Sequence, residues 1–372
     1  MSIIKPVKRF ITKNTVFCIA TLVAIITCFF VLPDKEYLGY FDWSTLACLF
    51  LTLAVICAFR NIKFFTIVAR KLVLFAGNLR SLFFVLIIIT FIGSMIIAND
   101  MALITFLPLG YFAVSVAKQE KYIPYLFILQ NISANLGGML TPFGNPQNLY
   151  LYSYFNIPTL EFCSIMLPPF ILAVAMLSLC CLFVKPIKLE IKEKFPEKLS
   201  IKRTLLYSVL FIFSILIVFR VIPFWVGLVI VPIVLLLVDK EALLMVDYGL
   251  LGTFFFFFIF AGNLSRIDAV NVLLSSLMQK DALLVSVLSC QGISNVPSAI
   301  LLSRFTENYK ELLLGVNIGG TGTLIASLAS LITFSEHRIL YPGHTKQYFW
   351  MFTLINAVFL VVMTLAAKLF FI

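Results

Sequence analysis

The sequence has few charged residues and almost no histidine. Only 12% of its 372 residues are Asp, Glu, Lys or Arg, and the two histidines, His337 and His344, lie in a short polar loop. The eight cysteines form no CxxC pair, so neither a disulfide framework nor a thiolate metal site is indicated. The sequence shows no nucleotide-binding loop and none of the paired aspartates, HExxH motif or Ser/His pair typical of a protease, which argues against direct ATP hydrolysis and intramembrane proteolysis.

Apolar residues are abundant instead. They make up 62% of the chain, and the mean hydropathy is +1.07, values typical of a polytopic membrane protein. The first apolar run, 15–32, follows several basic residues but precedes VLPDKEY rather than a small-residue cleavage site. We therefore expect it to be a membrane span and not a signal peptide.

Nine apolar runs are long enough to cross a bilayer core. They lie at 15–32, 44–59, 122–150, 160–184, 204–219, 222–238, 248–263, 311–335 and 347–371. Two further runs, 81–117 and 281–303, are interrupted halfway by Asn99-Asp100 and by Ser294-Asn295. Each of these two runs is predicted to form a re-entrant helical hairpin.

The distribution of lysine and arginine predicts the orientation, since these residues accumulate on the cytoplasmic side. With the N-terminus inside, 21 of the 28 basic residues fall in cytoplasmic segments. The N-terminus is thus predicted to be cytoplasmic and the C-terminus extracytoplasmic. The net charge of +11 is attributed to the basic cytoplasmic loops and their contact with anionic lipid, and not to nucleic-acid binding.

Five spans separate the two hairpins, so the hairpins must enter from opposite faces of the membrane. An amphipathic segment precedes each hairpin, at 61–80 and at 266–280. This order of parts predicts two inverted-topology repeats, a symmetry that places the substrate site of a transporter near the midplane. The first repeat covers 1–184 (hairpin 81–117, broken helix 122–150), a cytoplasmic basic linker covers 185–203, and the second repeat covers 204–372 (hairpin 281–303, broken helix 311–335).

A glycine-rich phrase occurs in both halves. NLGGMLTPFGNP at 135–146 aligns with NIGGTGTLIASL at 317–328. The identical pairs are Asn135/Asn317, Gly137/Gly319, Gly138/Gly320 and Thr141/Thr323, and Gly144/Ala326 and Asn145/Ser327 are close matches. Glycine and proline favour departure from helical geometry, and unwound backbone at this depth is tolerated where it is buried or faces a wet cavity. Alternatively, these residues only serve helix packing and kinking.

Three helix starts are predicted beside these phrases. Asn295 with Pro297, Asn99 at the first hairpin tip, and Asn145 with Pro146 each have the form of a helix N-terminus. The partly positive ends of three such helices could bind a carboxylate or another oxyanion without an intramembrane Arg or Lys. Asp100 could instead be a simple helix cap.

Four stretches, taken together, resemble the paired motifs of the ion transporter superfamily: ANDMALITFLP, NLGGMLTPFGNPQN, SNVPSAILL and VNIGGTGTLIASLAS. This superfamily groups divalent-anion:sodium symporters, citrate permeases, arsenite permeases and a sodium/proton antiporter branch. The chain is most similar to small bacterial citrate-transporter-like permeases of unknown substrate. The resemblance implies a multi-pass protein of the bacterial inner membrane, which could form a homodimer.

The resemblance also implies site residues. Sodium-coupled members carry a Ser-Asn-Thr triplet at each hairpin tip, where this chain has Ala98-Asn99-Asp100 and Ser294-Asn295-Val296. The implied cation-binding positions are Asn99, Asp100, Gly144, Ser294, Asn295 and Ala326. The implied substrate-binding positions are Asn99, Asp100, Asn145, Pro146, Asn295, Val296 and Ser327. A carboxylate at Asp100, in place of threonine, would attract a cation or carry a proton.

The sequence thus predicts a secondary active transporter and not an enzyme. We expect symport of a small, di- or tricarboxylate-like anion with Na⁺ or H⁺ by alternating access, with bound sodium ions as the only associated groups. Asp100 at the first hairpin tip favours a sodium/proton antiporter or an arsenite or oxyanion efflux permease as the alternative. A membrane scaffold or membrane enzyme without transport activity is a more distant possibility.

Overall fold

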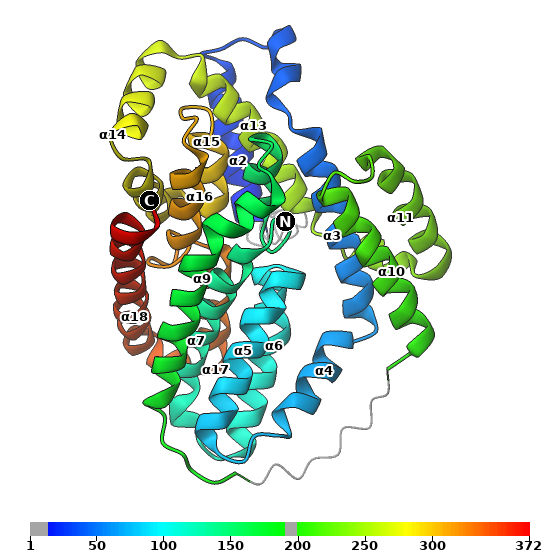
Figure 1. The fold of residues 1–372 in the computed structure, drawn as a ribbon, viewed down its shortest axis with the longest axis vertical. Helices are drawn as coiled ribbons and strands as arrows, with labels where there is room; N and C mark the ends of the chain where they lie inside the picture. The colour runs from blue at the N-terminus through cyan, green and yellow to red at the C-terminus, as the bar shows by residue number, and fades with distance from the viewer. Residues whose placement is uncertain (1–13, 190–198) are drawn as a thin grey trace, which may run out of the picture.

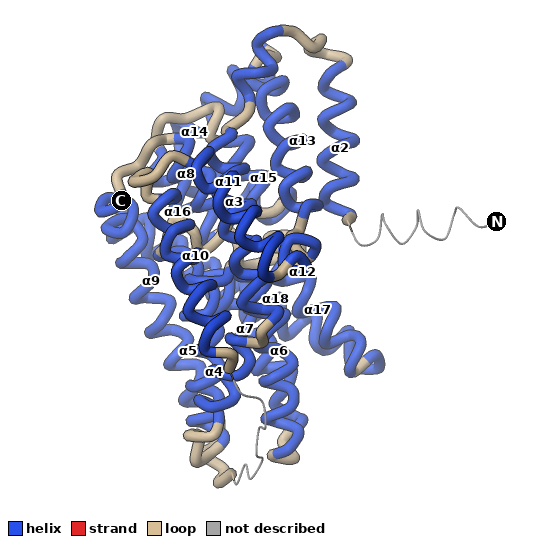
Figure 2. Tube along the Cα trace, turned by 90° about the vertical axis from the view of Figure 1, so that its right-hand side faces the viewer, coloured by secondary structure: helices blue, strands red, loops and turns tan. Residues whose placement is uncertain are grey.

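The computed structural model describes residues 14–189 and 199–372, and all regular elements in these ranges are helices (Figures 1 and 2). Eight stretches are long and apolar enough to cross a membrane. They are α3 (Trp43–Asn61), α5 (Leu79–Ile97), α6 (Asn99–Val116), α9 (Thr159–Leu182), α10 (Ile201–Val218), α13 (Tyr248–Ser265), α14 (Asp268–Ile293) and the C-terminal stretch Pro342–Phe371, which contains α18 (Thr345–Ala366). The predicted all-α polytopic membrane fold is confirmed.

Seven of the nine predicted spans form single helices, among them the shorter α2 (Thr15–Cys28) and α11 (Phe224–Val238). The other two are broken, as the glycine-rich phrases predict. One consists of α7 (Ile123–Gly137), a short 3-10 turn and α8 (Pro146–Tyr154), and the other of α16 (Tyr309–Ile318) and α17 (Leu328–Leu340). Asn145 and Ser327 cap the helices that follow the two breaks, because a side-chain oxygen there satisfies a free backbone N–H.

Both predicted hairpins turn at a single residue. Ala98 joins α5 to α6 with φ 62° and ψ 154°, and Ser294 joins α14 to α15 (Asn295–Leu302) with φ 74° and ψ 159°. Positive φ is uncommon for residues other than glycine and indicates local strain. The same unusual conformation at corresponding places in the two halves is strong evidence that the hairpins are structural equivalents.

The first turn of each hairpin's leading arm also matches. The Asn78 side chain accepts a hydrogen bond from the Ser81 N–H at 2.9 Å, and Asp281 accepts one from the Leu284 N–H at 2.9 Å. Asp281 has non-helical dihedral angles, which separate the amphipathic part of α14 from the hairpin arm. The returning arms differ, since α6 has 18 residues and α15 only eight. At 1.5 Å per residue, α15 is about 12 Å long and cannot cross the bilayer.

The hairpins approach the middle of the molecule from opposite ends. Figure 1 shows α5, α6 and α7 in the lower half and α14, α15 and α16 in the upper half, with the two breaks between them. The amphipathic α4 (Phe64–Val73) lies beside α6 in the lower half. Helix α3 is the most enclosed of the candidate spans, with 72% of its apolar window buried, so it is a central packing helix and has little contact with lipid.

The structure differs from the sequence prediction at the end of the linker and at His337. Residues 190–198 of the predicted linker 185–203 lie outside the described residues, and Ile201 to Arg203 already belong to α10. The placement of His337 in a polar loop is wrong. This histidine is fully buried in α17, and its ring stacks on Tyr348 at a centroid distance of 3.8 Å, because α17 continues to Leu340.

Candidate functional site

A cavity of about 90 Å³ lies where the first hairpin tip meets the second half of the chain. Its wall comes from α3, the first tip, the loop before α8, the start of α13 and the start of α17. The lining residues are Leu49, Thr52, Leu53, Ile56, Ala98, Asp100, Met101, Ile104, Phe143, Asn145, Pro146, Asp247, Leu250, Leu328 and Ile332.

Four helices begin at this cavity. They are α6 at Asn99, α8 at Pro146, α13 at Tyr248 and α17 at Leu328. The convergence of several helix N-termini matches the sequence prediction, but their identity differs. The start of α15 does not line the cavity, because its first N–H groups bond within the second half, and α13 and α17 contribute instead.

Asp100 and Asp247 are the two acidic residues of the cavity wall. The Asp100 Oδ1 is buried and has no hydrogen-bond partner among the described residues. Asp247 caps α13, and its Oδ1 accepts from the Leu250 N–H at 3.0 Å. Two carboxylates facing one enclosed space repel each other when both are charged, and a proton or a cation relieves that repulsion.

Two asparagines connect the halves across the breaks. Asn135, near the end of α7, accepts at Oδ1 from the Ser327 hydroxyl at 2.7 Å and from the Asn99 Nδ2 at 3.3 Å. Asn317, near the end of α16, accepts at Oδ1 from the Asn145 Nδ2 at 3.1 Å. Each asparagine thus bonds the cap of the helix that follows the break in the other half, and the two breaks hold each other in a reciprocal arrangement.

We expect Asn317→Ala to lower the free energy of unfolding by about 1–3 kcal/mol. Asn317 also donates from Nδ2 to the Asn148 Oδ1 at 2.6 Å, and all three asparagine side chains are buried. Truncation therefore leaves polar groups of Asn145 and Asn148 unpaired. The measurement is thermal unfolding of the detergent-purified protein. Ser276→Ala is the matched control, because Ser276 is exposed and bonds only within its own helix, and equal effects of the two variants would contradict the prediction.

The second hairpin tip packs directly on the second break. The Ala326 carbonyl accepts from the Asn295 N–H at 2.9 Å and from the Ser294 hydroxyl at 3.3 Å. The Asn295 Oδ1 accepts from the Val296 N–H at 2.9 Å. A carbonyl oxygen has two lone pairs, so a cation at Ala326 would have to replace one of these donors.

Asn295 nevertheless lies close to the hydrogen bonds that Asn135 makes between the two halves. A β-carbon built on Gly320 would lie 3.1 Å from the Asn295 Nδ2 and 3.8 Å from the Asn135 Oδ1. Asn135 in turn bonds Asn99 of the first tip. The two tip asparagines therefore meet in one buried region between the two breaks, and neither faces lipid, since both are 4% exposed.

Equivalent hydrogen bonds fix each break to its hairpin. The Thr141 hydroxyl donates to the Met95 carbonyl at 2.9 Å, and the Thr323 hydroxyl donates to the Gln291 carbonyl at 3.0 Å. Met95 and Gln291 each lie three residues before their hairpin turn. The threonine identity in the aligned phrases thus corresponds to the same contact in both halves.

The predicted site residues fall into four groups. Asp100, Asn145 and Pro146 line the cavity, and Asn99 and Ser327 are joined to each other through Asn135. Gly144 packs against Gly138 beside the cavity. Ser294, Asn295, Val296 and Ala326 form the second tip and its contact with the break.

Sequence reasoning omitted three residues from the candidate site. Asn135 and Asn317 stood out as identities in the aligned phrases, and that signal was sufficient to propose them. Asp247 gave no such signal, because an aspartate just before an apolar run is an ordinary helix cap. Only the position of the α13 start in the wall of the same cavity as Asp100 assigns it to the candidate site.

Comparison with known proteins agrees with the fold and the motifs. Residues 3–309 match the family model described as citrate transporter. An uncharacterized transporter of Methanocaldococcus jannaschii is 34% identical over 309 residues, which cover 82% of this chain and 83% of that protein. The inner membrane protein YbiR of Escherichia coli is 29% identical over 354 residues, covering 91% of this chain and 93% of that protein. The resemblance stated from the motifs is confirmed: the chain is a membrane transporter that belongs to the citrate transporter family.

Proposed function

We propose that the protein is a secondary active transporter that moves a small anion together with a cation, Na⁺ or H⁺, by alternating access. The observation that carries this proposal is the cavity in which four helix N-termini and two carboxylates meet. Helix N-termini favour an anion, and carboxylates favour a cation. One enclosed space with both kinds of group suits coupled binding of the two ions.

The anion would be held by helix ends and amide groups. Helices α8 and α17 begin at the cavity with Pro146 and Leu328, and the caps of these helices, Asn145 and Ser327, come from the two halves of the chain. The Asn135 Nδ2 is a buried donor with no partner among the described residues, so it can donate to an anionic oxygen. Di- and tricarboxylates fit this donor set because each carboxylate accepts several hydrogen bonds.

The cation would be held at Asp100. Its unpaired Oδ1 offers a carboxylate oxygen, and Asp247 adds a second carboxylate to the same wall. Asn99 and the backbone at Gly144 lie next to Asp100 and Asn145 in the chain and complete the proposed cation position. Ser294, Asn295 and Ala326 are the proposed second position. A cation bound at Asp100 would also neutralise the carboxylate that otherwise repels an anion.

The test is a thermal-shift screen of the purified protein. Citrate, other di- and tricarboxylates, sulfate, phosphate and arsenite are each added with sodium and, in a parallel series, with choline in its place and at several pH values. We expect one anion to raise the melting temperature, and to do so more strongly with sodium or at low pH. Stabilisation that is the same in all cation conditions would exclude coupled binding.

A second candidate function rests on the two carboxylates of the cavity. Asp100 and Asp247 also suit a sodium/proton antiporter or an oxyanion efflux permease, in which ion and proton compete for the same carboxylates. Growth of a sensitive strain that expresses the protein separates these functions from anion uptake. Resistance to high sodium would favour antiport, and resistance to arsenite would favour oxyanion efflux.

The proposed setting is the cytoplasmic membrane, with the N-terminus inside and the C-terminus outside. The excess of lysine and arginine in the segments counted as cytoplasmic supports this orientation. A homodimer is the proposed assembly, supported by the resemblance to a superfamily whose members are often dimers.

A further inference from the structure

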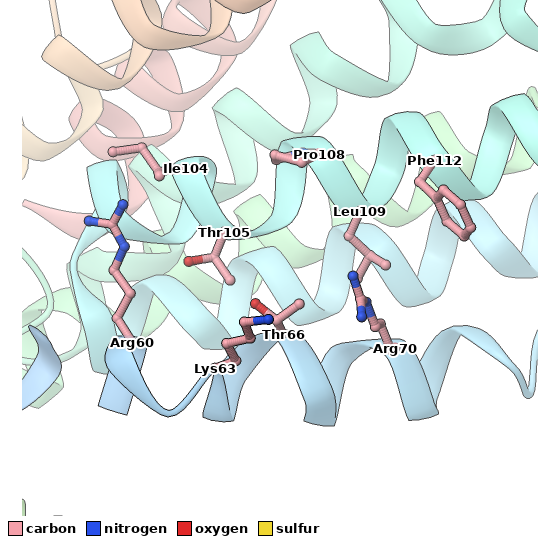
Figure 3. Close-up of a pocket in the computed structure, with 9 residues that line it drawn as sticks. All are labelled: Arg60, Lys63, Thr66, Arg70, Ile104, Thr105, Pro108, Leu109 and Phe112. Atoms are coloured by element: carbon pink, nitrogen blue, oxygen red, sulfur yellow. The ribbon is translucent and has the colours of Figure 1, made fainter. Parts of the chain in front are cut away.

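A second hollow, which we call the basic groove, lies between α4 and α6 and has a volume of about 390 Å³ (Figure 3). The end of α3 and the start of α4 form one wall, and α6 forms the other. Its lining residues are Arg60, Lys63, Thr66, Arg70, Ile104, Thr105, Pro108, Leu109 and Phe112.

The two walls of the basic groove differ in character. Figure 3 shows Thr66 and Arg70 on α4, with Arg60 and Lys63 before its start, opposite the α6 side chains. Three of the nine lining residues are cationic and none is acidic, while the α6 wall is mostly apolar. Such a pair of walls suits a ligand that combines an oxyanion with an apolar part.

Local structure explains why the cationic side chains share one face. Thr66 and Arg70 lie four residues apart in α4 and therefore on one side of that helix, and Lys63 is the residue just before the helix begins. Lys63 itself has left-handed backbone angles, with φ 54°, and this turn sets α4 at an angle to α3. Arg60, in the last turn of α3, is thereby brought to the same groove as the α4 residues.

The basic groove lies next to the cavity of the candidate site. Ile104 lines both hollows, and Asp100, Ile104, Pro108 and Phe112 recur every four residues along α6. The Arg60 Nη1 lies 3.7 Å from the Met101 Sδ, and Met101 also lines the cavity. A ligand in the groove would therefore contact the same face of α6 that carries Asp100.

We propose that the basic groove binds a phosphate-type oxyanion. Guanidinium groups bind phosphate through paired, charge-assisted hydrogen bonds, and lysine adds a positive point charge. The ligand is either free phosphate or the headgroup of an anionic phospholipid, whose acyl chains would lie on the apolar α6 wall. The positive-inside count assigns segment 60–80 to the cytoplasmic side, where juxtamembrane basic residues attract anionic lipids.

Binding is tested on the full-length protein in detergent. Inorganic phosphate and short-chain phosphatidylglycerol are titrated separately, with short-chain phosphatidylcholine as the uncharged-headgroup comparison, and thermal stability and native mass spectrometry are the readouts. We expect saturable binding of phosphatidylglycerol, of phosphate, or of both. Phosphatidylcholine should not give the same binding or the same rise in thermal stability. Binding of both shows that the phosphate group suffices, and binding of the lipid alone assigns the headgroup as the natural ligand.

The groove is located by a pair of double variants. Arg60→Gln with Arg70→Gln should weaken binding about tenfold or more, the loss that corresponds to removing strong charge-assisted contacts. Lys71→Gln with Lys202→Gln removes the same charge from exposed positions outside the groove and should leave the affinity unchanged. Equal losses in the two double variants, or no binding of either ligand by the unmodified protein, would overturn the proposal.

Two features keep this test independent of transport. Where both phosphate and phosphatidylglycerol bind the unmodified protein, they should compete for the same site, and this can be measured even if the double variant fails to fold. Binding at the groove does not require an ion-coupled cycle, so the result stands whether or not the screen for the transported anion succeeds.

Discussion

Asp100→Asn is expected to abolish ion coupling while the protein still inserts and folds. The side chain is nearly unchanged in size, but it loses the charge with which it would hold a proton or cation at the cavity. We expect anion uptake into proteoliposomes to lose its dependence on the sodium or proton gradient. Coupling free energies are typically about 1–3 kcal/mol, so gradient-driven uptake should fall by about 5- to 150-fold.

The control for this variant is Asp268→Asn, which removes the same charge from an exposed position in the first turn of α14. Its uptake should match that of the unmodified protein. Equal monodispersity and melting temperature of both variants would show that loss of transport does not reflect misfolding. Uptake by Asp100→Asn that keeps the normal dependence on pH and sodium would reject a coupling role for this carboxylate.

Gly144→Ala is expected to destabilise the first break and to reduce transport with it. A β-carbon at Gly144 would lie 2.3 Å from the carbonyl oxygen of Gly138 and 2.5 Å from the Thr141 Oγ1. The first of these atoms belongs to the backbone, so it cannot move aside as a flexible side chain could. Overpacking of this kind costs about 1–3 kcal/mol, and the shift would separate Asn145 from its partner Asn317.

Gly292→Ala is the matched control for the glycine variant. Gly292 also lies in a hairpin near its tip, but a β-carbon there would meet no heavy atom within 4 Å. Its melting temperature should be unchanged or higher, since alanine favours a helix over glycine. If the Gly144→Ala protein is as stable and as active as Gly292→Ala, the prediction is wrong. The backbone at the first break would then accommodate a β-carbon despite its short distance to Gly138.

The broken helices were predictable because their cause is local. Glycine, proline and a capping residue alter backbone preferences wherever they stand, so the two aligned phrases predicted the breaks before α8 and α17. The hairpin turns at Ala98 and Ser294 were predicted within one residue from the polar tips. Their left-handed geometry was not predictable, since neither residue favours positive φ, and only the surrounding packing imposes it.

The cavity was harder to predict because its wall is assembled from distant segments. Asp247 and Leu328, from the second half of the chain, line the same cavity as Asp100 from the first half. The start of α15 was expected near the other two helix starts because of Asn295 and Pro297, but its N-terminus bonds Ala326 instead. A sequence motif indicates that a helix starts, but it does not indicate which neighbour that start will face.

By itself, the sequence determined the membrane setting, the spans, the two hairpins and the paired breaks, because hydropathy and backbone preference act over a few neighbouring residues. The tertiary structure alone decided which helix starts share a cavity, that Asn135 and Asn317 join the halves, and that Asp247 and the basic groove lie along the same side of α6 as Asp100. These features depend on the packing of helices that are separated in the sequence, and no local pattern encodes which of those helices will meet.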